Sequence, residues 1–342
     1  MKSVGRNMNK KIEQSDIDFV LIWVDDSDVE WQKSKAKYRG EAEKFNINNV
    51  RYRDWGTLKY WFRAVEKYAP WVRKIHFVTC GHVPKWLNLN HPKLNFVKHE
   101  DYIPKEFLPT FSSHPIELNL HRIKDLSEKF VYFNDDYFIN APVQPNDFFI
   151  NDLPCDAAIL NPQNMDRFGI PNIVVNDLGI IEYYFDFKKQ LKRNLGKWVN
   201  LKYGKLLFRT MLLLPWGKYV GFYEPHLPNS FLKKTFLEVW GKEKILLEET
   251  STHKFRDNSD VNQWLMRYWQ LAKGSFVPRN PKIGRMFSVA DGIMPICNAI
   301  NEQKYKLICI NDSEKIQDIE EMKNKILKSF DKKLKNKSGF EL

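Results

Sequence analysis

The chain has 342 residues, of which 43% are hydrophobic and 14% aromatic, so its composition is not that of a disordered protein and it can bury a sizeable core. Its 54 Lys and Arg residues outnumber 42 Asp and Glu residues, and the formal net charge of +12 favours anionic partners without specifying which kind. The four cysteines stand far apart with no C-x-x-C pair, which argues against a disulfide scaffold or a cysteine zinc site and favours a reducing compartment.

No segment has the pattern of a membrane span. The basic N-terminus, residues 1–11, lacks the apolar stretch of a secretion signal. The most apolar run, Leu206 to Val220, is broken by charged residues, proline and glycine, and it is shorter than the ~20 apolar residues that a spanning helix needs. We therefore expect a cytoplasmic protein, with any membrane contact peripheral and at the inner face of the cell membrane.

The first half of the chain alternates strands with helices, which predicts a parallel sheet. Ile17 to Val24 and Ile75 to Thr79 are apolar runs typical of buried strands. Between them, apolar residues at spacings of three and four predict a helix from Gly56 to Tyr68. The same patterns predict three further elements: a short strand from Asn95 to Val97, a helical face from His114 to Ile123, and a strand from Phe130 to Phe133.

The second half begins with a change of composition. Between about Asp186 and Arg209, lysines and arginines are interleaved with Leu191, Leu195 and Trp198, which is typical of a basic amphipathic insertion or simply of a solvated helix face. The elements expected after it are a helix capped by Ser230 and ended by Gly241, a helix capped by Asp260 and ended by Gly274, a strand from Lys306 to Ile310, and a helix from Glu314 to Phe330 followed by a fraying lysine-rich tail.

Carboxylates gather where three of the predicted strands end. In an open α/β sheet, ligands bind at the carboxyl ends of the strands, and clustered carboxylates there suit a hard cation such as Mg²⁺. For any single Asp pair, the alternative is that it caps the following turn. The clusters are Asp25, Asp26 and Asp28 after the first strand, Asp135 and Asp136 after the strand ending at Phe133, and Asn311-Asp312 after the last strand.

The chain contains neither a P-loop nor a G-x-G-x-x-G fingerprint, so arginines and a metal would have to bind phosphate. Each arginine is equally explained as a surface ion-pair partner. A histidine is a plausible general base, although a lone histidine is more often structural; His226, between two prolines, is the first candidate. The other residues considered are Arg51, Arg53, Arg63, Arg122 and Arg256 among the arginines, and His114 and His121 among the histidines.

Eight motifs follow one another between Asp16 and Ser313. They are I-D-F-V-L-I-W-V-D-D-S-D (17–28), R-Y-R-D (51–54), W-V-R-K-I-H-F-V-T (71–79), L-P-T-F-S-S-H (108–114), L-H-R-I (120–123), L-S-E-K-F-V-Y-F-N-D-D (126–136), H-L-P (226–228) and I-C-I-N-D-S (308–313). In this order they resemble the four blocks of the Stealth family, sugar-1-phosphate transferases of capsule and cell-wall polysaccharide synthesis. The first block usually reads T-W-V-D-G and here reads I-W-V-D-D.

The resemblance implies an α/β fold like that of type A nucleotide-sugar transferases, Rossmann-like with a mixed sheet, a helical basic insertion and a C-terminal helix. It implies transfer of a hexose or N-acetylhexosamine 1-phosphate from a UDP-sugar to an acceptor hydroxyl, with release of UMP. The implied roles are binding of the nucleotide-sugar by Asp25, Asp28, Arg51, Arg53, Arg122 and Asn311, binding of Mg²⁺ or Mn²⁺ by Asp135, Asp136 and Asp312, and catalysis by Asp136, by His226 as base and by Arg256 on the phosphate.

On this interpretation the chain divides into a flexible N-terminus (1–14), a nucleotide-sugar-binding core (15–160), a variable basic insertion (161–225), a second part of the catalytic core (226–313) and a C-terminal helix and tail (314–342). The expected partners are the UDP-sugar, a growing polysaccharide or lipid-linked oligosaccharide, and an anionic membrane surface. Two alternatives stay open: a conventional metal-dependent glycosyltransferase that releases UDP, and a nucleic-acid-binding protein. Acidic strand ends argue against nucleic acid as a partner.

Overall fold

The computed structural model describes residues 16–39, 52–167, 169–316 and 318–342. Its central sheet has five strands in the order β3-β2-β1-β4-β8. The strands β1 to β4 pair in parallel, and β8 runs antiparallel to β4 at the edge. This mixed sheet confirms the predicted α/β class. In sheet order, the strands are Leu94–Lys98, Ile75–Thr79, Ile17–Ile22, Lys129–Phe133 and Asn229–Leu232.

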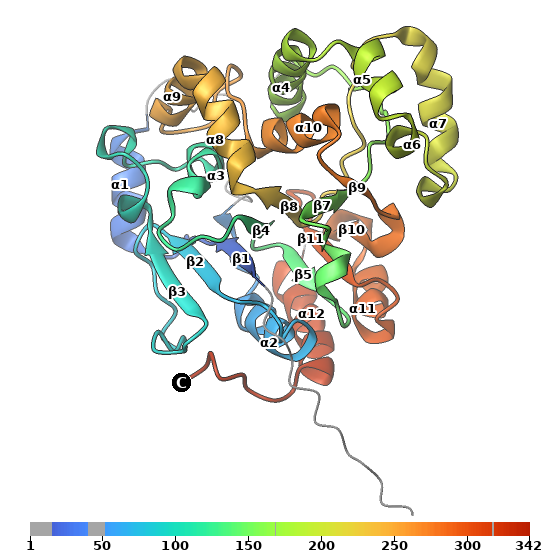
Figure 1. Ribbon diagram of the computed structural model, residues 1–342. Helices are drawn as coiled ribbons and strands as arrows, with labels where there is room; N and C mark the ends of the chain where they lie inside the picture. The colour runs from blue at the N-terminus through green and yellow to red at the C-terminus, as the bar shows by residue number, and fades with distance from the viewer. Residues whose placement is uncertain (1–15, 40–51, 168, 317) are drawn as a thin grey trace, which may run out of the picture.

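Helices cover both faces of this sheet, as Figure 1 shows. Side chains alternate across β1, so that Phe19 and Leu21 belong to the core on one face and Val20 to the core on the other. Phe19 and its neighbours pack against α2 (Leu58–Tyr68), α11 (Ile293–Glu302) and α12 (Ile319–Lys333). The opposite face packs against α3 (Ser113–Leu118), α8 (Lys233–Lys242) and α10 (Gln263–Lys273).

Asp18, the one charged residue inside β1, is fully buried. Its carboxylate accepts hydrogen bonds from Arg73 Nε at 2.8 Å and lies 2.9 Å from His76 Nε2. Burial alone would raise the pKa of Asp18, but the hydrogen bonds with His76 and Arg73 lower it below its usual value. His76 on β2 and Arg73 just before it therefore allow β1 to carry the charged Asp18 in the core.

A second sheet brings two distant strand ends together. It has the order β10-β11-β5, with β10 (Gly284–Ser288) parallel and β5 (Tyr137–Ile139) antiparallel to β11 (Leu307–Asn311). Because β5 follows β4 after three residues, the end of β11 meets the end of β4, and Ile310 N donates to Asp136 O at 2.9 Å. A third small sheet contains β6 (Phe149–Ile150), β7 (Leu153–Asp156) and β9 (Val277–Pro278).

The predicted basic insertion is helical, but it consists of short helices rather than one long one. They gather at the upper right of Figure 1. Among the described residues, none of the helices has the length and apolar character needed to cross a membrane. The helices are α4 (Ile170–Tyr184), α5 (Phe187–Arg193), α6 (Leu195–Trp198) and α7 (Leu206–Leu213), followed by the 3₁₀ turn η8 (Leu214–Trp216).

The two ends of the insertion are fastened together at its base. Leu160 and Phe222 form an antiparallel bridge, Asn161 N donates to Gly221 O at 3.0 Å, and Tyr223 N donates to Ile159 O at 2.7 Å. Gly221 has a φ of +125°, and a Cβ on it would lie 2.5 Å from the carbonyl oxygen of Asn161. Only glycine allows the two chain segments to approach this closely.

Two predicted helix starts were wrong. Ser230 lies in β8, because Phe231 and its neighbours pair with the free edge of β4, and α8 begins only at Lys233. The cap of α10 is Asn262, whose side chain accepts from Trp264 N, whereas Asp260 is bound by two histidines. The predicted end of that helix at Gly274 is confirmed.

Two other predicted elements differ in detail. The helical face from His114 to Ile123 is interrupted at Asn119, which is buried and donates from Nδ2 to Pro115 O at 2.8 Å; α3 ends there, and a 3₁₀ turn covers Leu120–Arg122. The chain beyond α12 is packed rather than frayed, since Phe340 is buried and Glu341 pairs with Arg63 at 2.7 Å. The remaining helices are α1 (Val29–Lys37) and α9 (Lys244–Thr252).

Candidate active site

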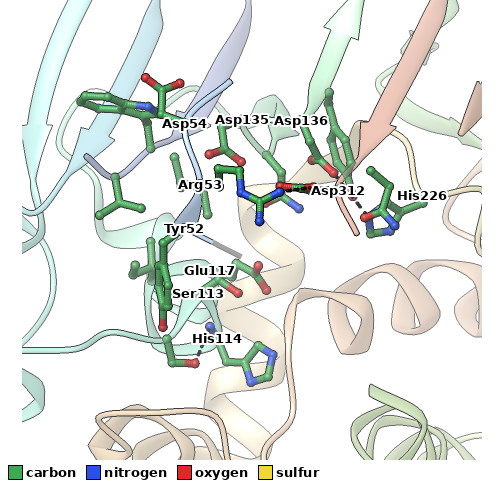
Figure 2. Close-up of a pocket in the computed structure, with 18 of the residues that line it drawn as sticks. Tyr52, Arg53, Asp54, Ser113, His114, Glu117, Asp135, Asp136, His226 and Asp312 are labelled. Carbon is green, nitrogen blue, oxygen red and sulfur yellow. Dashed lines mark hydrogen bonds and ion pairs between the residues drawn. The ribbon is translucent and has the colours of Figure 1, made fainter. Parts of the chain in front are cut away.

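A cavity of about 620 Å³ opens where the parallel strands end. The chain leaves β1 toward β2 on one side and returns to β4 on the other, so β1 and β4 form the switch point at which open α/β sheets bind ligands. Residues that follow β1, β2, β4 and β11 all line the cavity, including Trp23, Cys80, Asp135 and Asp312. Figure 2 shows how side chains from these separate strands converge.

The wall of the cavity is acidic. Six carboxylic acids and two arginines are among its lining residues in the described parts of the chain. Burial, together with the carboxylates of Asp136 and Asp54, raises the pKa of Asp135 to about 8. Burial also raises the pKa of Asp136, although His226 and Cys309 oppose this. A cation that enters with an anionic ligand would reduce the repulsion between that ligand and the ionised carboxylates.

Asp312 reaches the cavity from the end of β11 and is held by two side-chain donors and by the backbone N–H of Ser313, which donates to Oδ1 at 2.6 Å. Arg53 Nη1 donates to Asp312 Oδ1 at 3.0 Å, and Trp55 Nε1 donates to Asp312 Oδ2 at 3.0 Å. The structure therefore brings together two residues for which the sequence predicted different roles, Arg53 in donor binding and Asp312 in metal binding. Asn311 lines the same cavity.

His226 lies opposite the end of β4, with its Nε2 atom 3.8 Å from Asp136 Oδ2. Its φ of +51° is in the left-handed region, which a residue with a side chain rarely adopts. The turn is braced from below: His226 N donates to Glu224 Oε1 at 3.3 Å, and the buried Arg267 donates to Glu224 Oε2 at 2.8 Å and to Asp156. Backbone strain of this kind persists where the surrounding contacts fix the residue.

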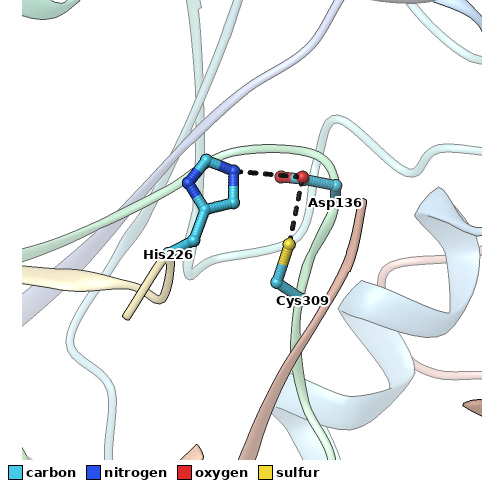
Figure 3. A group of neighbouring side chains, drawn as sticks. All are labelled: Asp136, His226 and Cys309. Atoms are coloured by element: carbon cyan, nitrogen blue, oxygen red, sulfur yellow. Dashed lines mark hydrogen bonds and ion pairs between the residues drawn. The ribbon is translucent and has the colours of Figure 1, made fainter. Parts of the chain in front are cut away.

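Asp136 also contacts Cys309, as Figure 3 shows. The Cys309 thiol donates to Asp136 Oδ2 at 3.2 Å, while Asp136 Oδ1 is buried and has no hydrogen-bond partner among the described residues. Ligand atoms of Asp136, His226 and Cys309 all lie within 4.8 Å of one another. One oxygen, one nitrogen and one sulfur suit a borderline ion such as Zn²⁺ better than Mg²⁺.

Arg256 and a second histidine lie on the other side of the cavity. Arg256 Nη2 donates to Ser113 Oγ at 3.1 Å, and both residues line the cavity. His114 Nδ1 lies 2.7 Å from Asp260 Oδ2, and its Nε2 is buried with no hydrogen-bond partner among the described residues. Burial lowers the pKa of His114 despite the opposing effect of Asp260, so the ring is neutral near pH 7. A carboxylate therefore orients this histidine, as general-base catalysis requires.

Three predicted donor-binding residues that the structure describes are not among those that line the cavity. Asp25 Oδ1 accepts from Ser27 N at 3.0 Å, and Asp28 Oδ1 caps α1 by accepting from Trp31 N at 2.7 Å. The turn-cap alternative thus describes what both carboxylates do in this structure. The Arg122 guanidinium lies 4.7 Å from the centroid of the Trp240 ring, at the surface of the molecule. Arg51 lies outside the described residues.

Two further sequence candidates have structural partners. Arg63 donates to both oxygens of Glu341 and to the carbonyl of Leu334, so it fixes the C-terminal segment. His121 is buried against Trp240, and burial lowers its pKa to about 4. Neither residue is among those lining the cavity.

Sequence reasoning did not assign a role to three acidic residues of the cavity wall. Asp54 belongs to the R-Y-R-D motif and acts electrostatically on Asp135. Glu117 accepts from Tyr132 OH at 3.0 Å, and Glu224 stands two residues before His226. The position of Asp54 next to Arg53 in a recognised motif was the one signal that could have identified it.

The sheet, its switch point and the acidic cavity define an α/β enzyme with a Rossmann-like transferase fold. Stealth protein conserved region 1 matches residues 15–43, and conserved region 2 matches residues 51–155. The chain is 50% identical over 97% of its length to the capsular polysaccharide phosphotransferase WcwK of Streptococcus pneumoniae, covering 99% of that protein. It is 45% identical over 95% of its length to the receptor polysaccharide phosphotransferase WefC of Streptococcus gordonii, again covering 99% of that protein. The chain therefore belongs to the Stealth family, and it is a transferase enzyme.

A more distant relative agrees with these two. The exopolysaccharide phosphotransferase cps2G of Lactiplantibacillus plantarum is 40% identical over 95% of this chain, which covers 96% of that protein. Because these similarities extend over nearly the whole chain, they include the insertion as well as the strand-end motifs. The resemblance found in the sequence motifs is thus confirmed.

Proposed function

We propose that this enzyme transfers a hexose 1-phosphate, or an N-acetylhexosamine 1-phosphate, from a UDP-sugar to a sugar hydroxyl of a growing capsular or cell-surface polysaccharide. The product is a phosphodiester link, and UMP is released. The relatives support polysaccharide phosphotransfer through their names. The observation that carries the finer proposal is the placement of His226 beside Asp136 in an acidic cavity at the sheet switch point.

In this reaction the oxygen of the acceptor hydroxyl attacks the phosphorus that bears the sugar. The bond between that phosphorus and the bridging oxygen of the pyrophosphate breaks, and UMP leaves with the bond electrons. The hydroxyl proton passes to His226, whose Nε2 lies at the cavity wall near Asp136. Asp136 then stabilises the imidazolium that forms, because the carboxylate is close enough for electrostatic attraction in a partly buried site.

We propose that the divalent ion is Mg²⁺ or Mn²⁺ bound by carboxylate oxygens, rather than an ion held by Asp136, His226 and Cys309, because His226 needs a free ring nitrogen to accept the hydroxyl proton. Asp135 and Asp136 would hold it, since both have raised pKa values from burial and neighbouring charges and Asp136 Oδ1 lacks a partner. Asp312 can contribute through Oδ2, which keeps a lone pair beyond its bond to Trp55, whereas Oδ1 already accepts from both Arg53 and Ser313 N. When bound, such an ion neutralises pyrophosphate oxygens and stabilises the charge of the leaving group.

The two cavity arginines have separate tasks in this proposal. Arg53 is fixed by Asp312 and points toward the acidic wall, so it is placed to contact the donor pyrophosphate beside the metal ligands. Arg256 lies across the cavity beside Ser113, where it is placed to stabilise the transferred phosphate. A planar guanidinium can bind two phosphate oxygens at once, which orients the phosphorus for attack.

The acceptor in this proposal is a polysaccharide or a lipid-linked oligosaccharide, and the site of action is the cytoplasm. All four cysteines are free thiols, and three of them are buried, which suits a reducing compartment.

The leaving nucleotide tests the reaction. Purified enzyme is incubated with a panel of UDP-sugars, Mg²⁺ and an oligosaccharide acceptor, and the released nucleotide and the product are identified by mass spectrometry. We expect UMP and a product that is heavier by a sugar phosphate. Acceptor-dependent release of UDP with a phosphate-free product would make the enzyme a conventional glycosyltransferase and overturn the proposal.

A further inference from the structure

The helix α7 and the turn η8 expose a row of large apolar side chains. Phe208, Met211 and Leu212 have the i, i+3, i+4 spacing that places them on one face of α7, and Phe208 and Leu212 are 69% and 65% exposed. Trp216, in η8, is 73% exposed. We call these four residues, together with Leu201 before the helix, the α7 surface. Soluble proteins rarely gather so many exposed apolar residues without a partner.

The exposure is not a sign that α7 packs poorly. Thr210, on the opposite side of the helix, is fully buried and accepts a hydrogen bond from Leu160 N at 3.1 Å. Leu206 and Leu207 pack against one core cluster, and Leu213 packs against another. The helix is therefore attached by one face, and the α7 surface is the face that remains.

The stretch of chain that contains this surface is rich in cations, and no acidic residue lies among them in the sequence. From Phe187 to Tyr223 the chain has nine Lys and Arg residues and no Asp or Glu. Lys188, on α5, lies beside η8: its Cε is 3.2 Å from where a Cβ on Gly217 would be. The other cations of this stretch are Lys189, Lys192, Arg193, Lys197, Lys202, Lys205, Arg209 and Lys218.

We propose that the α7 surface binds an anionic phospholipid bilayer, with its apolar side chains in the acyl-headgroup boundary and the cations of this stretch of chain on lipid phosphates. This combination of an apolar face and flanking lysines is the one that interfacial helices use. A second copy of the chain fits less well, because two such surfaces would bring many like charges together. In Figure 1, α7 lies at the outer edge of the molecule, where a flat bilayer can reach it.

The structure changes which residues carry this contact. The sequence pattern favoured Leu191, Leu195 and Trp198, but Trp198 is fully buried, where its ring packs against Phe187 and Tyr219. Leu191 is partly buried against the same core. Leu195 is exposed, as the sequence pattern predicted, but the largest group of exposed apolar side chains lies on α7 and η8, so the test is designed on these elements.

The test is sedimentation of the full chain with vesicles of phosphatidylcholine alone and of phosphatidylcholine mixed with phosphatidylglycerol. We expect binding that rises with phosphatidylglycerol and falls with added salt. The triple variant Phe208→Ser, Leu212→Ser, Trp216→Ser should have a partition coefficient at least about tenfold lower than the wild type. These substitutions remove the apolar area that the bilayer would bury. The quadruple variant with Lys188, Lys189, Lys192 and Arg193 changed to Gln loses most of the dependence on phosphatidylglycerol and salt.

A matched control removes exposed apolar residues elsewhere: Leu237→Ser, Ile245→Ser, Met294→Ser, whose side chains are also exposed. This control should bind vesicles like the wild type, and all variants should keep turnover on a short soluble acceptor, which separates this proposal from the proposed reaction. Binding by the Phe208, Leu212, Trp216 variant equal to the wild type would overturn the proposal. The proposal would also be overturned if the wild type bound no vesicles but formed a dimer that this variant abolished. The partner of the α7 surface would then be a second copy of the chain.

Discussion

Two acidic clusters follow parallel strands of the same sheet, yet they meet different surroundings. After β1, the chain continues into helix α1. The backbone N–H of Ser27 donates to the Asp25 carboxylate, and that of Trp31 donates to the Asp28 carboxylate. After β4, the chain continues within three residues into β5, and no helix begins there. Asp135 and Asp136 therefore face the cavity, where burial raises the pKa of both, with repulsion from Asp136 and Asp54 added at Asp135 and repulsion from Asp312 added at Asp136.

The difference shows what makes a strand-end carboxylate available for chemistry. An Asp that precedes a helix is used locally, because the helix leaves unpaired N–H groups at its start. An Asp between two strands lacks the unpaired N–H groups of a helix start. Asp135 and Asp136 have backbone hydrogen bonds, and Asp136 has the Cys309 thiol, but these donors do not offset the effect of burial on the two pKa values. Each of the following predictions tests whether this distinction holds in solution.

The largest effect is expected at His226, the neighbour that distinguishes the β4 cluster. His226→Ala should lower the rate of UMP formation about 10²–10⁴-fold, because a general base contributes on this scale. Donor binding, measured by calorimetry, should change little. His114→Ala is the matched comparison. If it causes the larger loss and His226→Ala keeps near-normal turnover, the histidine held by Asp260 is the base and His226 is structural.

The next prediction compares the effect on turnover of one substitution in each acidic cluster. Asp136→Asn should lower turnover about 10²–10³-fold, which is typical when a group that stabilises transition-state charge is lost. Asp28→Asn keeps an acceptor oxygen for Trp31 N and should keep near-normal turnover. Thermal unfolding of both variants verifies that they are folded.

Chelation complements that pair of variants. EDTA should abolish UMP formation by the wild type, and added Mg²⁺ or Mn²⁺ should restore it. Full activity in EDTA, or in the Asp136→Asn variant, would remove a metal from the mechanism.

An effect on the order of 3 kcal/mol between pH 5.5 and 8.5 is expected in the pH dependence of stability. With its pKa raised to about 8, Asp135 holds a proton in the folded state at pH values where the unfolded chain has lost it. The folded state then binds more protons, so its free energy of unfolding in EDTA falls as pH rises from about 4 to 8. The free energy of unfolding is measured by urea titration at pH 5.5 and at pH 8.5. The difference between the two values should be smaller for Asp135→Asn than for the wild type. Identical falls in both proteins would mean that Asp135 is ionised throughout.

The smallest effect concerns the cap of α1. Asp28→Ala should lower the free energy of unfolding by about 1 kcal/mol, as expected for loss of an N-cap, while Asp28→Asn should cost only a few tenths. Urea titration measures both. A loss of turnover in Asp28→Ala comparable to that of Asp136→Asn would place the β1 cluster in donor binding after all.

The sequence predicted the four N-terminal strands of the central sheet to within two residues of their ends, because buried strands leave a strong apolar signal. It could not separate Asp28 from Asp136, since a cap and a free carboxylate look alike until the following element is known. It also placed Ser230 in a helix, because nothing local reveals that β4 has a free edge for β8 to pair with.

The insertion shows the same limit. Its composition predicted basic amphipathic helices, and helices are present, but Trp198, which was expected at the surface, is buried, and Phe208, for which the pattern made no prediction, is exposed. Trp198 is buried because α6 is short and its tryptophan packs among Phe187, Tyr219 and Phe222. Which apolar side chains remain exposed depends on how several short helices pack together, and that information is not local.

The backbone pairing between the two ends of the insertion has a consequence for how such enzymes diversify. Residues 159–161 pair with residues 221–223, and His226 follows only three residues after this paired segment. The chain between the two segments can therefore change in length and surface chemistry without moving the histidine. The proposed base, His226, can then keep its position when the insertion differs, and Gly221 is the residue that lets the two segments pair this closely.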